Sequence, residues 1–253
     1  MTQNALKKRI AAGELTIGAW LGVPEPLIVE AMVSCGFDWM VVDMEHGAVD
    51  IADLPMLFAA AERRGAAPLV RLPAMDPILA RRALDAGALG LLVPVVEDAV
   101  LFADFARHCH YPPKGRRGVG LSRANLWGDD FAGYLADFQP ILVPQIETRK
   151  GTEAADALAA LAETDALFIG PYDLSADLGR AGDFTQPAFV QALSQIKAAC
   201  AKHRKAFGGH QVAPDMNELR AKIAEGFRFL AFGTDVLALR QSFAGLKDIA
   251  RRP

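Results

Sequence analysis

Short apolar runs alternate with helical stretches along most of the chain, and this alternation restricts the possible folds more than any other feature. The eight runs are TIGAWLG (16–22), WMVVDM (39–44), APLVRL (67–72), LGLLVPVV (89–96), PILVPQIE (140–147), ALFIGP (166–171), AFGG (206–209) and FRFLAFG (227–233). Runs that are apolar throughout are typical of strands in a parallel sheet that is covered on both faces. Eight such strands, each followed by a helix, predict a (β/α)8 barrel (TIM barrel), and a doubly wound open sheet is the alternative.

The stretches between the runs have the apolar spacing that is typical of helices. They include residues 25–35, 50–64, 76–86, 97–109, 150–162, 187–204, 214–225 and 235–250. Glycine ends or follows four of them, in SCGFDW, RRGAAP, DAGALG and AEGFRF, where it can adopt the left-handed conformation of a helix C-terminus. Because barrels of about 250 residues routinely form one domain, we expect residues 1–253 to form a single barrel domain.

The composition excludes several classes of protein. The net charge is −3, so the chain lacks the basic balance that is typical of nucleic-acid binding. The three cysteines, Cys35, Cys109 and Cys200, are far apart, which argues against a disulfide framework or a zinc site. The N-terminal residues lack the apolar core of a signal peptide, and no apolar run reaches the roughly 18 residues of a membrane span. We therefore expect a cytoplasmic protein that binds neither nucleic acid nor a membrane.

Residues 111–138 interrupt the alternation with a long connection rich in glycine, proline and arginine. Connections of this length in compact domains are usually functional or lie at subunit interfaces. The GVGLSR segment (118–123) superficially resembles a phosphate-binding loop, but no strand precedes it and the glycine fingerprint is incomplete. We therefore do not expect a nucleotide site there.

Polar side chains gather where the predicted strands end, which is the position of catalytic residues in barrels of this kind. They are Asp43, Glu45, His46, Arg71, Gln145, Glu147, Asp173, His210 and Gln211. A single polar residue at such a position is usually a helix cap or a solvated loop residue, as Asp173 would be for a short LSADLG helix. Arg71 and Glu147 fit that explanation less well, because a charge at the end of an apolar strand needs a partner. Their occurrence together on one rim favours an active site.

These residue types favour metal-assisted chemistry. Glu147 and Asp173 lie on adjacent strand ends and suit a hard divalent ion such as Mg²⁺ or Mn²⁺, which prefers oxygen ligands. Only two protein ligands would leave positions open for Lewis-acid catalysis. Arg71 would stabilise a developing oxyanion, and His46 would carry a proton near neutral pH. No lysine lies at a strand end, so a Schiff-base mechanism has no obvious nucleophile.

The motifs DMEHG (43–47), VRLP (70–73), PQIET (144–148) and GPYDLS (170–175) together resemble those of the class II, metal-dependent pyruvate aldolases of the HpcH/HpaI family. The resemblance covers nearly the whole chain. It implies a barrel of the pyruvate/phosphoenolpyruvate superfamily whose last helix is exchanged between the subunits of a homo-oligomer, usually a hexamer. It also implies reversible cleavage of 4-hydroxy-2-oxo acids to pyruvate and an aldehyde, with Mg²⁺, Mn²⁺ or Co²⁺ bound and no organic cofactor.

The resemblance further implies residue roles. Glu147 and Asp173 would bind the metal, and Glu45 would reach it through a bound water. Pyruvate would contact Gln145 and the backbone of Gly170, Pro171, Tyr172 and Asp173. Arg71 would stabilise the enolate, and His46 would accept the proton of the 4-hydroxyl, with either Asp43 or Asp85 raising its basicity. Arg123 and Val212 would shape the aldehyde side, Arg123 from the long connection and across a subunit boundary.

Two other functions fit parts of the sequence. An acyl-CoA lyase of the malyl- or citryl-CoA type would need a basic site for the CoA phosphates, for which KGRR (114–117) is the only candidate. A non-catalytic barrel that binds a small acid would not need the carboxylates, Arg71 and His46 that are present here.

Overall fold

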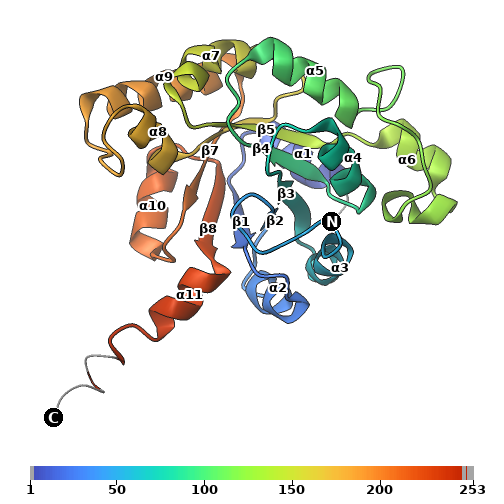
Figure 1. Cartoon of the computed structure of the whole chain (residues 1–253), viewed down its shortest axis with the longest axis horizontal. Coiled ribbons are helices and arrows are strands. Elements are labelled where there is room, and N and C mark those ends of the chain that lie inside the picture. Colours follow the sequence, from blue (N-terminus) through green and yellow to red (C-terminus); the bar gives the residue numbers. More distant parts are fainter. Residues whose placement is uncertain (1–2, 247–248, 250–253) are drawn as a thin grey trace.

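The computed structural model describes residues 3–246 and residue 249, and its centre is a closed barrel of parallel strands in the order β1 to β8 (Figure 1). The strands are β1 (Thr16–Leu21), β2 (Trp39–Asp43), β3 (Ala67–Arg71), β4 (Gly90–Val93), β5 (Ile141–Ile146), β6 (Ala166–Ile169), β7 (Ala206–Gln211) and β8 (Phe229–Thr234). Because β8 pairs with β1, the barrel is closed and the open-sheet alternative is excluded. The (β/α)8 prediction is confirmed. The predicted single domain includes residues 1–2, 247–248 and 250–253, which lie outside the described residues.

Every strand is followed by a helix, and the expected helices occur within a few residues of their predicted bounds. They are α2 (Pro26–Val33), α3 (Leu54–Arg63), α4 (Pro77–Asp85), α5 (Ala99–Cys109), α7 (Arg149–Ala160), α9 (Pro187–His203), α10 (Met216–Ala224) and α11 (Asp235–Ser242). Side chains of Asp76, Asp98 and Asp215 accept backbone hydrogen bonds at three of the N-termini, which satisfies otherwise unpaired N–H groups. Helix α11 ends at Ser242, earlier than predicted, and a turn follows it.

Four further elements were not predicted as such: α1 (Gln3–Ala11), the 3₁₀ helix η1 (Arg123–Gly128), α6 (Phe131–Asp137) and α8 (Pro171–Asp177). The long connection thus contains η1 and α6. Helix α1 closes the end of the barrel at which the strands begin, because its Leu6 and Ile10 are buried among the side chains of the barrel interior. Helix α8 begins three residues before the expected LSADLG segment, so Asp173 lies in its first turn and does not cap it.

The barrel interior is filled by alternate residues of the strands, as the period of two along a strand requires. The rings of Trp39 and Phe229 stack there with their centroids 4.3 Å apart. Gly18 accommodates the Trp39 ring, since a Cβ at this position would lie 2.1 Å from it. A second apolar cluster lies between the strands and the surrounding helices and includes Leu57, Phe58 and Phe102. Two apolar layers therefore hold the strand ends in fixed positions.

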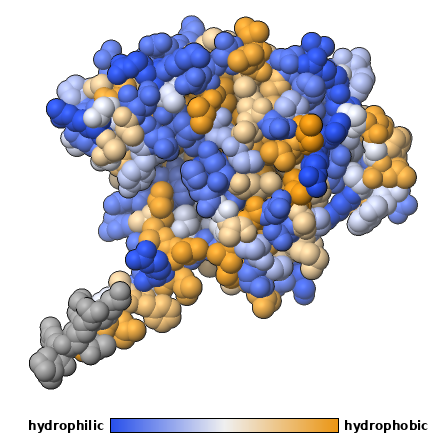
Figure 2. All heavy atoms as spheres, viewed as in Figure 1, coloured by the Kyte–Doolittle hydropathy of each residue, from blue (hydrophilic) through white to orange (hydrophobic). Residues whose placement is uncertain are grey.

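Helix α11 projects away from the barrel, so that one side of it is not covered (Figure 1). Its Val236 and Leu239, and Phe243 just beyond it, are exposed, and Figure 2 shows apolar side chains where the helix leaves the barrel. Val236 and Leu239 also line a cavity of about 310 Å³ together with Val23 and Ile28. Of the helices described, none is both long and apolar enough to cross a membrane.

Candidate active site

The candidate site is formed where the inward-facing rows of the barrel reach the carboxyl ends of the strands. Trp39 and Val41 lie in the interior, and the next residue of their row is Asp43. Arg71 continues the row of Ala67 and Leu69 in the same way. The alternation that fills the core thus also directs these polar side chains into the mouth of the barrel.

Asp43 and Arg71 form a two-pronged ion pair across neighbouring strands. Arg71 Nε lies 2.8 Å from Asp43 Oδ1, and Arg71 Nη2 lies 2.5 Å from Asp43 Oδ2. Burial raises the pKa of Asp43, but the Arg71 guanidinium outweighs burial and holds the pKa below its ordinary value. Arg71 Nη1 is 2.9 Å from Glu45 Oε2. The pair therefore fixes the guanidinium plane in the site.

Trp20, which the sequence analysis did not single out, contacts both members of this ion pair. Its Nε1 donates to Asp43 Oδ2 at 3.1 Å, and the Arg71 guanidinium carbon lies 4.8 Å from its ring centroid. The Trp20 ring also stacks with His210, with centroids 4.4 Å apart, and with Phe168 at 5.9 Å. Burial lowers the pKa of His210 to about 4, so this imidazole is neutral near pH 7. Trp20 lies inside an apolar run, where no polar residue marks it, and its inward direction was the only available signal.

The Glu147 carboxylate accepts two hydrogen bonds, and a glycine leaves room for it. Val95 donates its backbone N–H to Glu147 Oε1 at 2.6 Å, and Gln145 Nε2 donates to Glu147 Oε2. Gly170 allows the carboxylate to come close, because a Cβ there would lie 2.5 Å from Glu147 Oε2. Burial is the main reason that the pKa of Glu147 is raised, and the nearby carboxylates of Glu45 and Asp173 raise it further.

Val95 has a φ of 50°, which a β-branched side chain rarely adopts. Such a conformation costs about 1–3 kcal/mol and is found mainly at functional sites. Here it directs the Val95 N–H toward Glu147. Sequence analysis missed this residue because it lies within an apolar run and nothing in its side chain indicates an unusual backbone.

Two adjoining cavities occupy the mouth of the barrel. The first has a volume of about 320 Å³ and is lined by Trp20, Asp43, His46, Arg71, Gln145, Phe168, Ile169, Gly170, Pro171, Tyr172, Asp173, His210, Val212 and Thr234. The second, of about 230 Å³, is lined by Glu45, His46, Val95, Glu147, Thr148, Asp173, Ala176 and Asp177. His46 and Asp173 line both cavities. Of the residues predicted for the site, all but Asp85 and Arg123 therefore lie together at this end of the barrel.

Asp85 and Arg123 lie outside both cavities, away from the mouth of the barrel. Asp85 ends α4 at the side where the strands begin, and its Oδ1 is 2.5 Å from Nη2 of the buried Arg117. Arg123 contacts Glu62 Oε2 at 2.6 Å and the Ala86 carbonyl at 3.3 Å. Within one chain, therefore, Asp85 cannot act on His46, because the end of a helix after β3 lies at the opposite end of the barrel from its mouth.

The expected contact between Asp43 and the His46 ring also differs. Asp43 Oδ1 accepts the backbone N–H groups of Glu45 at 3.0 Å and of His46 at 3.2 Å. The aspartate thus shapes the turn that carries His46, while its charge is directed at Arg71. The described structure shows no hydrogen bond from the His46 ring to either aspartate.

The donor set at Glu147 fits a divalent ion. Gln145 Oε1 is buried and accepts no hydrogen bond in the described structure, which is costly unless a ligand or cation satisfies it, whereas Glu45 Oε2 already has the Arg71 guanidinium beside it. The carboxylates of Glu45 and Asp173 lie close enough to Glu147 to add to the rise in its pKa that burial causes. No cluster of three or more metal-binding side chains occurs among the described residues, so any ion would depend on oxygens from substrate or water as well.

Comparison with known proteins gives a consistent result. Residues 16–242 match the family model described as HpcH/HpaI aldolase/citrate lyase. The hydroxypyruvate/pyruvate aldolase of Roseovarius nubinhibens is 37% identical over 243 residues, which cover 94% of this chain and 93% of the relative. The 5-keto-4-deoxy-D-glucarate aldolase of Salmonella paratyphi C is 35% identical, over 98% of this chain and 97% of the relative.

Solved structures agree in fold. The crystal structure of an HpcH/HpaI aldolase/citrate lyase family protein from Burkholderia cenocepacia J2315 superposes with a TM-score of 0.91 and 32% identity. The match covers 98% of this chain and 100% of that one.

Proposed function

The chain belongs to the HpcH/HpaI aldolase/citrate lyase family, and on this basis we propose that it catalyses the reversible aldol cleavage of 4-hydroxy-2-oxo acids to pyruvate and an aldehyde. It is a carbon–carbon lyase. The observation that carries the proposal is the meeting of Arg71, His46 and Glu147 around two joined cavities. This arrangement offers a fixed cation, a proton acceptor and oxygen ligands within one small site.

Glu147 and Asp173 would hold a divalent ion, with Mg²⁺, Mn²⁺ and Co²⁺ as candidates and no organic cofactor required. When bound, such an ion supplies Lewis-acid stabilisation of negative charge on substrate oxygen. The buried Gln145 Oε1, which accepts no hydrogen bond in the described structure, supports the assignment. Glu45 would act through a bound water, and its contact with Arg71 keeps its carboxylate at the edge of the site.

Arg71 would stabilise the enolate of pyruvate. Its guanidinium carries five N–H groups, and Asp43 engages only the Nε edge, so N–H groups on Nη1 and Nη2 remain for substrate oxygen. The ion pair and the Trp20 ring prevent the guanidinium from turning away. A donor that is fixed in advance needs little reorganisation when charge develops in the transition state.

His46 would accept the proton of the substrate 4-hydroxyl. As that proton leaves, the carbonyl of the aldehyde forms, the C3–C4 bond breaks, and its electron pair becomes the enolate of pyruvate. The enolate then takes a proton at C3. His46 is exposed and lines both cavities, so it can exchange its proton with solvent after each cycle.

Pyruvate would lie against Gln145 and the backbone of Gly170–Asp173, which line the first cavity. Tyr172 and Val212 lie on the same cavity and would border the aldehyde. The donor half is surrounded by buried groups and the aldehyde half by exposed ones such as Tyr172. We therefore expect a strict requirement for pyruvate and tolerance toward the aldehyde.

The subunits would form a homo-oligomer in which α11 packs on a neighbour. The exposed apolar residues Val236, Leu239 and Phe243, and the cavity beside α2, support this assembly. A hexamer follows from the family resemblance. In such an assembly a neighbouring chain could bring Asp85 and Arg123 to the site, which a single chain does not.

The alternative function, an acyl-CoA lyase, has less support from the structure. Its only candidate for a phosphate site, KGRR, contains Arg117, whose guanidinium is buried among Tyr111, Tyr134 and Phe138 and paired with Asp85. Arg116 pairs with Asp104. The buried Arg117 side chain is therefore not available to a phosphate.

Synthesis in the reverse direction tests the proposed activity. The assembled protein is incubated with Mn²⁺ or Mg²⁺, pyruvate and a panel of aldehydes, and the adducts are identified by mass spectrometry and NMR. We expect 4-hydroxy-2-oxo acids from several aldehydes. Adducts that form at full rate in excess chelator would contradict metal dependence, and a complete absence of adducts and of cleavage would contradict the lyase activity itself.

A further inference from the structure

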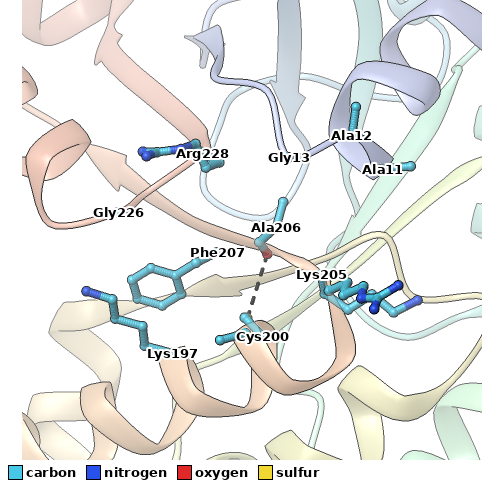
Figure 3. A pocket seen from close by; sticks show the side chains of 12 residues that line it. Ala11, Ala12, Gly13, Lys197, Cys200, Lys205, Ala206, Phe207, Gly226 and Arg228 are labelled. Atoms are coloured by element: carbon cyan, nitrogen blue, oxygen red, sulfur yellow. Dashed lines mark hydrogen bonds between the residues drawn. The ribbon is translucent and has the colours of Figure 1, made fainter.

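A further cavity, separate from those described above, lies at the end of the barrel opposite the candidate active site (Figure 3). Its volume is about 400 Å³, within the range of small-molecule sites. It is bounded by residues 11–13 after α1, by the C-terminal part of α9, and by the starts of β7 and β8. Because strands begin at this end, the cavity cannot be an extension of the mouth where they finish.

Four cationic side chains line this cavity: Lys197, Arg204, Lys205 and Arg228. Among the residues that the structure describes, no aspartate or glutamate lines it, although acidic residues outnumber basic ones in the chain. None of the four makes an ion pair within the described part of the chain. The carboxylates of Asp165 and Glu163 act on Lys205 without pairing with it and do not line the cavity, so the lining itself is positive, which favours an anion.

Three of the four cations are held in place by backbone carbonyls. Lys205 Nζ donates to the Thr164 carbonyl at 2.6 Å, and Arg228 Nη1 donates to the carbonyls of Phe227 at 2.8 Å and Ile223 at 3.0 Å. Lys197 Nζ donates to the Glu225 carbonyl. These bonds orient the side chains but leave their formal charge unneutralised, and each group keeps further N–H donors.

The floor of the cavity is apolar. Figure 3 shows Phe207 between Lys197 and Arg228 on one side and Lys205 on the other, with Ala206 beside it. Cys200 also lines the cavity; burial raises its pKa to about 12, so its thiol adds no negative charge. An apolar floor with cations at its edge suits a ligand that is part anion and part apolar group.

Arg204 adds a further observation. Its φ of 55° lies in the left-handed region, at the C-terminus of α9, where glycine is the usual residue. Glycine would be the most favourable residue for this turn, but it would bring no charge to the cavity. Arginine is strained here and brings a guanidinium to it. The same geometry makes glycine a substitution that removes the charge without cost to the backbone.

We propose that this cavity binds an organic phosphate. Phosphate matches the planar fork of arginine and the point charge of lysine, and a phosphate dianion is better suited than a single carboxylate to several cations. The organic part would cover Phe207 and Ala206. The proposal does not depend on the reaction assigned to the mouth of the barrel.

Calorimetric titration of the assembled protein at low ionic strength tests the site, with AMP and inorganic phosphate as probes. We expect AMP to bind more tightly than inorganic phosphate, because only AMP can cover the apolar floor. Arg204→Gly and Lys197→Gln should each weaken AMP binding about tenfold, the effect of losing one charge-assisted hydrogen bond. Lys202→Gln, on the same helix but paired with Asp156 at 2.8 Å, is the matched control and should bind AMP as wild type does.

Arg71→Ala locates the probe, because Arg71 is a cationic group of the other site. AMP affinity that is unchanged in Arg71→Ala and reduced in Arg204→Gly supports the proposal. The proposal is overturned if AMP does not bind, if it binds no better than inorganic phosphate, or if its affinity depends on Arg71 and not on Arg204. Circular dichroism of Arg204→Gly checks that the fold is retained, which the left-handed φ at this position leads us to expect.

Discussion

Arg71 and Asp43 meet at the mouth of the barrel through two parallel hydrogen bonds, of 2.8 and 2.5 Å, while both side chains are almost entirely buried. Their strands are neighbours in register, so the residues lie directly opposite each other. The pair fixes the cation that we assign to the enolate. Because it is buried, its integrity also matters for stability.

Asp43→Ala should therefore lower the free energy of unfolding by about 3–5 kcal/mol, the usual cost of leaving one member of a buried ion pair alone. The double variant Asp43→Ala/Arg71→Met also removes the buried guanidinium that Asp43→Ala leaves with Glu45 as its remaining carboxylate partner, so part of this loss should be recovered. Urea denaturation of both single variants and the double variant measures the coupling. Strictly additive losses would show that the two side chains do not stabilise each other.

Gly170→Ala should reduce pyruvate formation by at least about tenfold, because the new Cβ would displace the Glu147 carboxylate and small displacements at reacting groups are costly. Gly120→Ala is the control, since a Cβ at Gly120 meets nothing within 4 Å. Steady-state cleavage rates of the two variants and of the wild type measure the effect. Equal activity in both would mean that the position of Glu147 is not critical.

His46→Ala should lose cleavage while keeping some exchange of the pyruvate C3 protons, because exchange does not require removal of a 4-hydroxyl proton. Arg71→Ala should lose both reactions, since the enolate is common to them. His108→Ala, on α5 and outside both cavities, should behave as wild type. If His46→Ala retained full cleavage, the proton would have to be accepted by another group.

Metal affinity should fall on acidification at a higher pH than for an ordinary glutamate, because the pKa of Glu147 is raised, chiefly by burial. Protonation removes the ligand, so binding is strong above that pKa and is lost as the pH falls through it. Mn²⁺ titrations between about pH 5 and about pH 8 measure the profile. In the metal-free protein the same raised pKa favours folding at low pH, and this contribution is lost as the pH rises through the folded-state pKa. A Mn²⁺ affinity that does not change with pH would exclude Glu147 as a titrating ligand.

The sequence was sufficient to predict the barrel, because each strand could be identified from its apolar run and four of the helix ends from their glycines. It also predicted most of the site, since Asp43, Arg71, Gln145 and Glu147 continue the inward-facing rows of their strands. It did not reveal Trp20 or Val95. The role of Trp20 depends on three partners from other strands, and that of Val95 on a backbone conformation that its side chain disfavours.

Asp85 and Arg123 illustrate a different limit. The family resemblance placed them in the site, but within one chain the end of α4 and the start of η1 lie at the opposite end of the barrel. A contribution of Asp85 and Arg123 to the site depends on how neighbouring subunits are arranged in an assembly. Neither motif spacing nor periodicity within one chain contains that information.

Exchange of the pyruvate C3 protons in D₂O, followed by NMR, tests the central claim most directly because it needs no aldehyde. Wild-type protein with Mn²⁺ should exchange these protons, and excess chelator or Glu147→Gln should abolish the exchange. Glu153→Gln, an exposed position on α7, should leave it unchanged. Exchange that persists at the wild-type rate in Glu147→Gln, or in excess chelator, would contradict an enolate stabilised by a metal ion at Glu147.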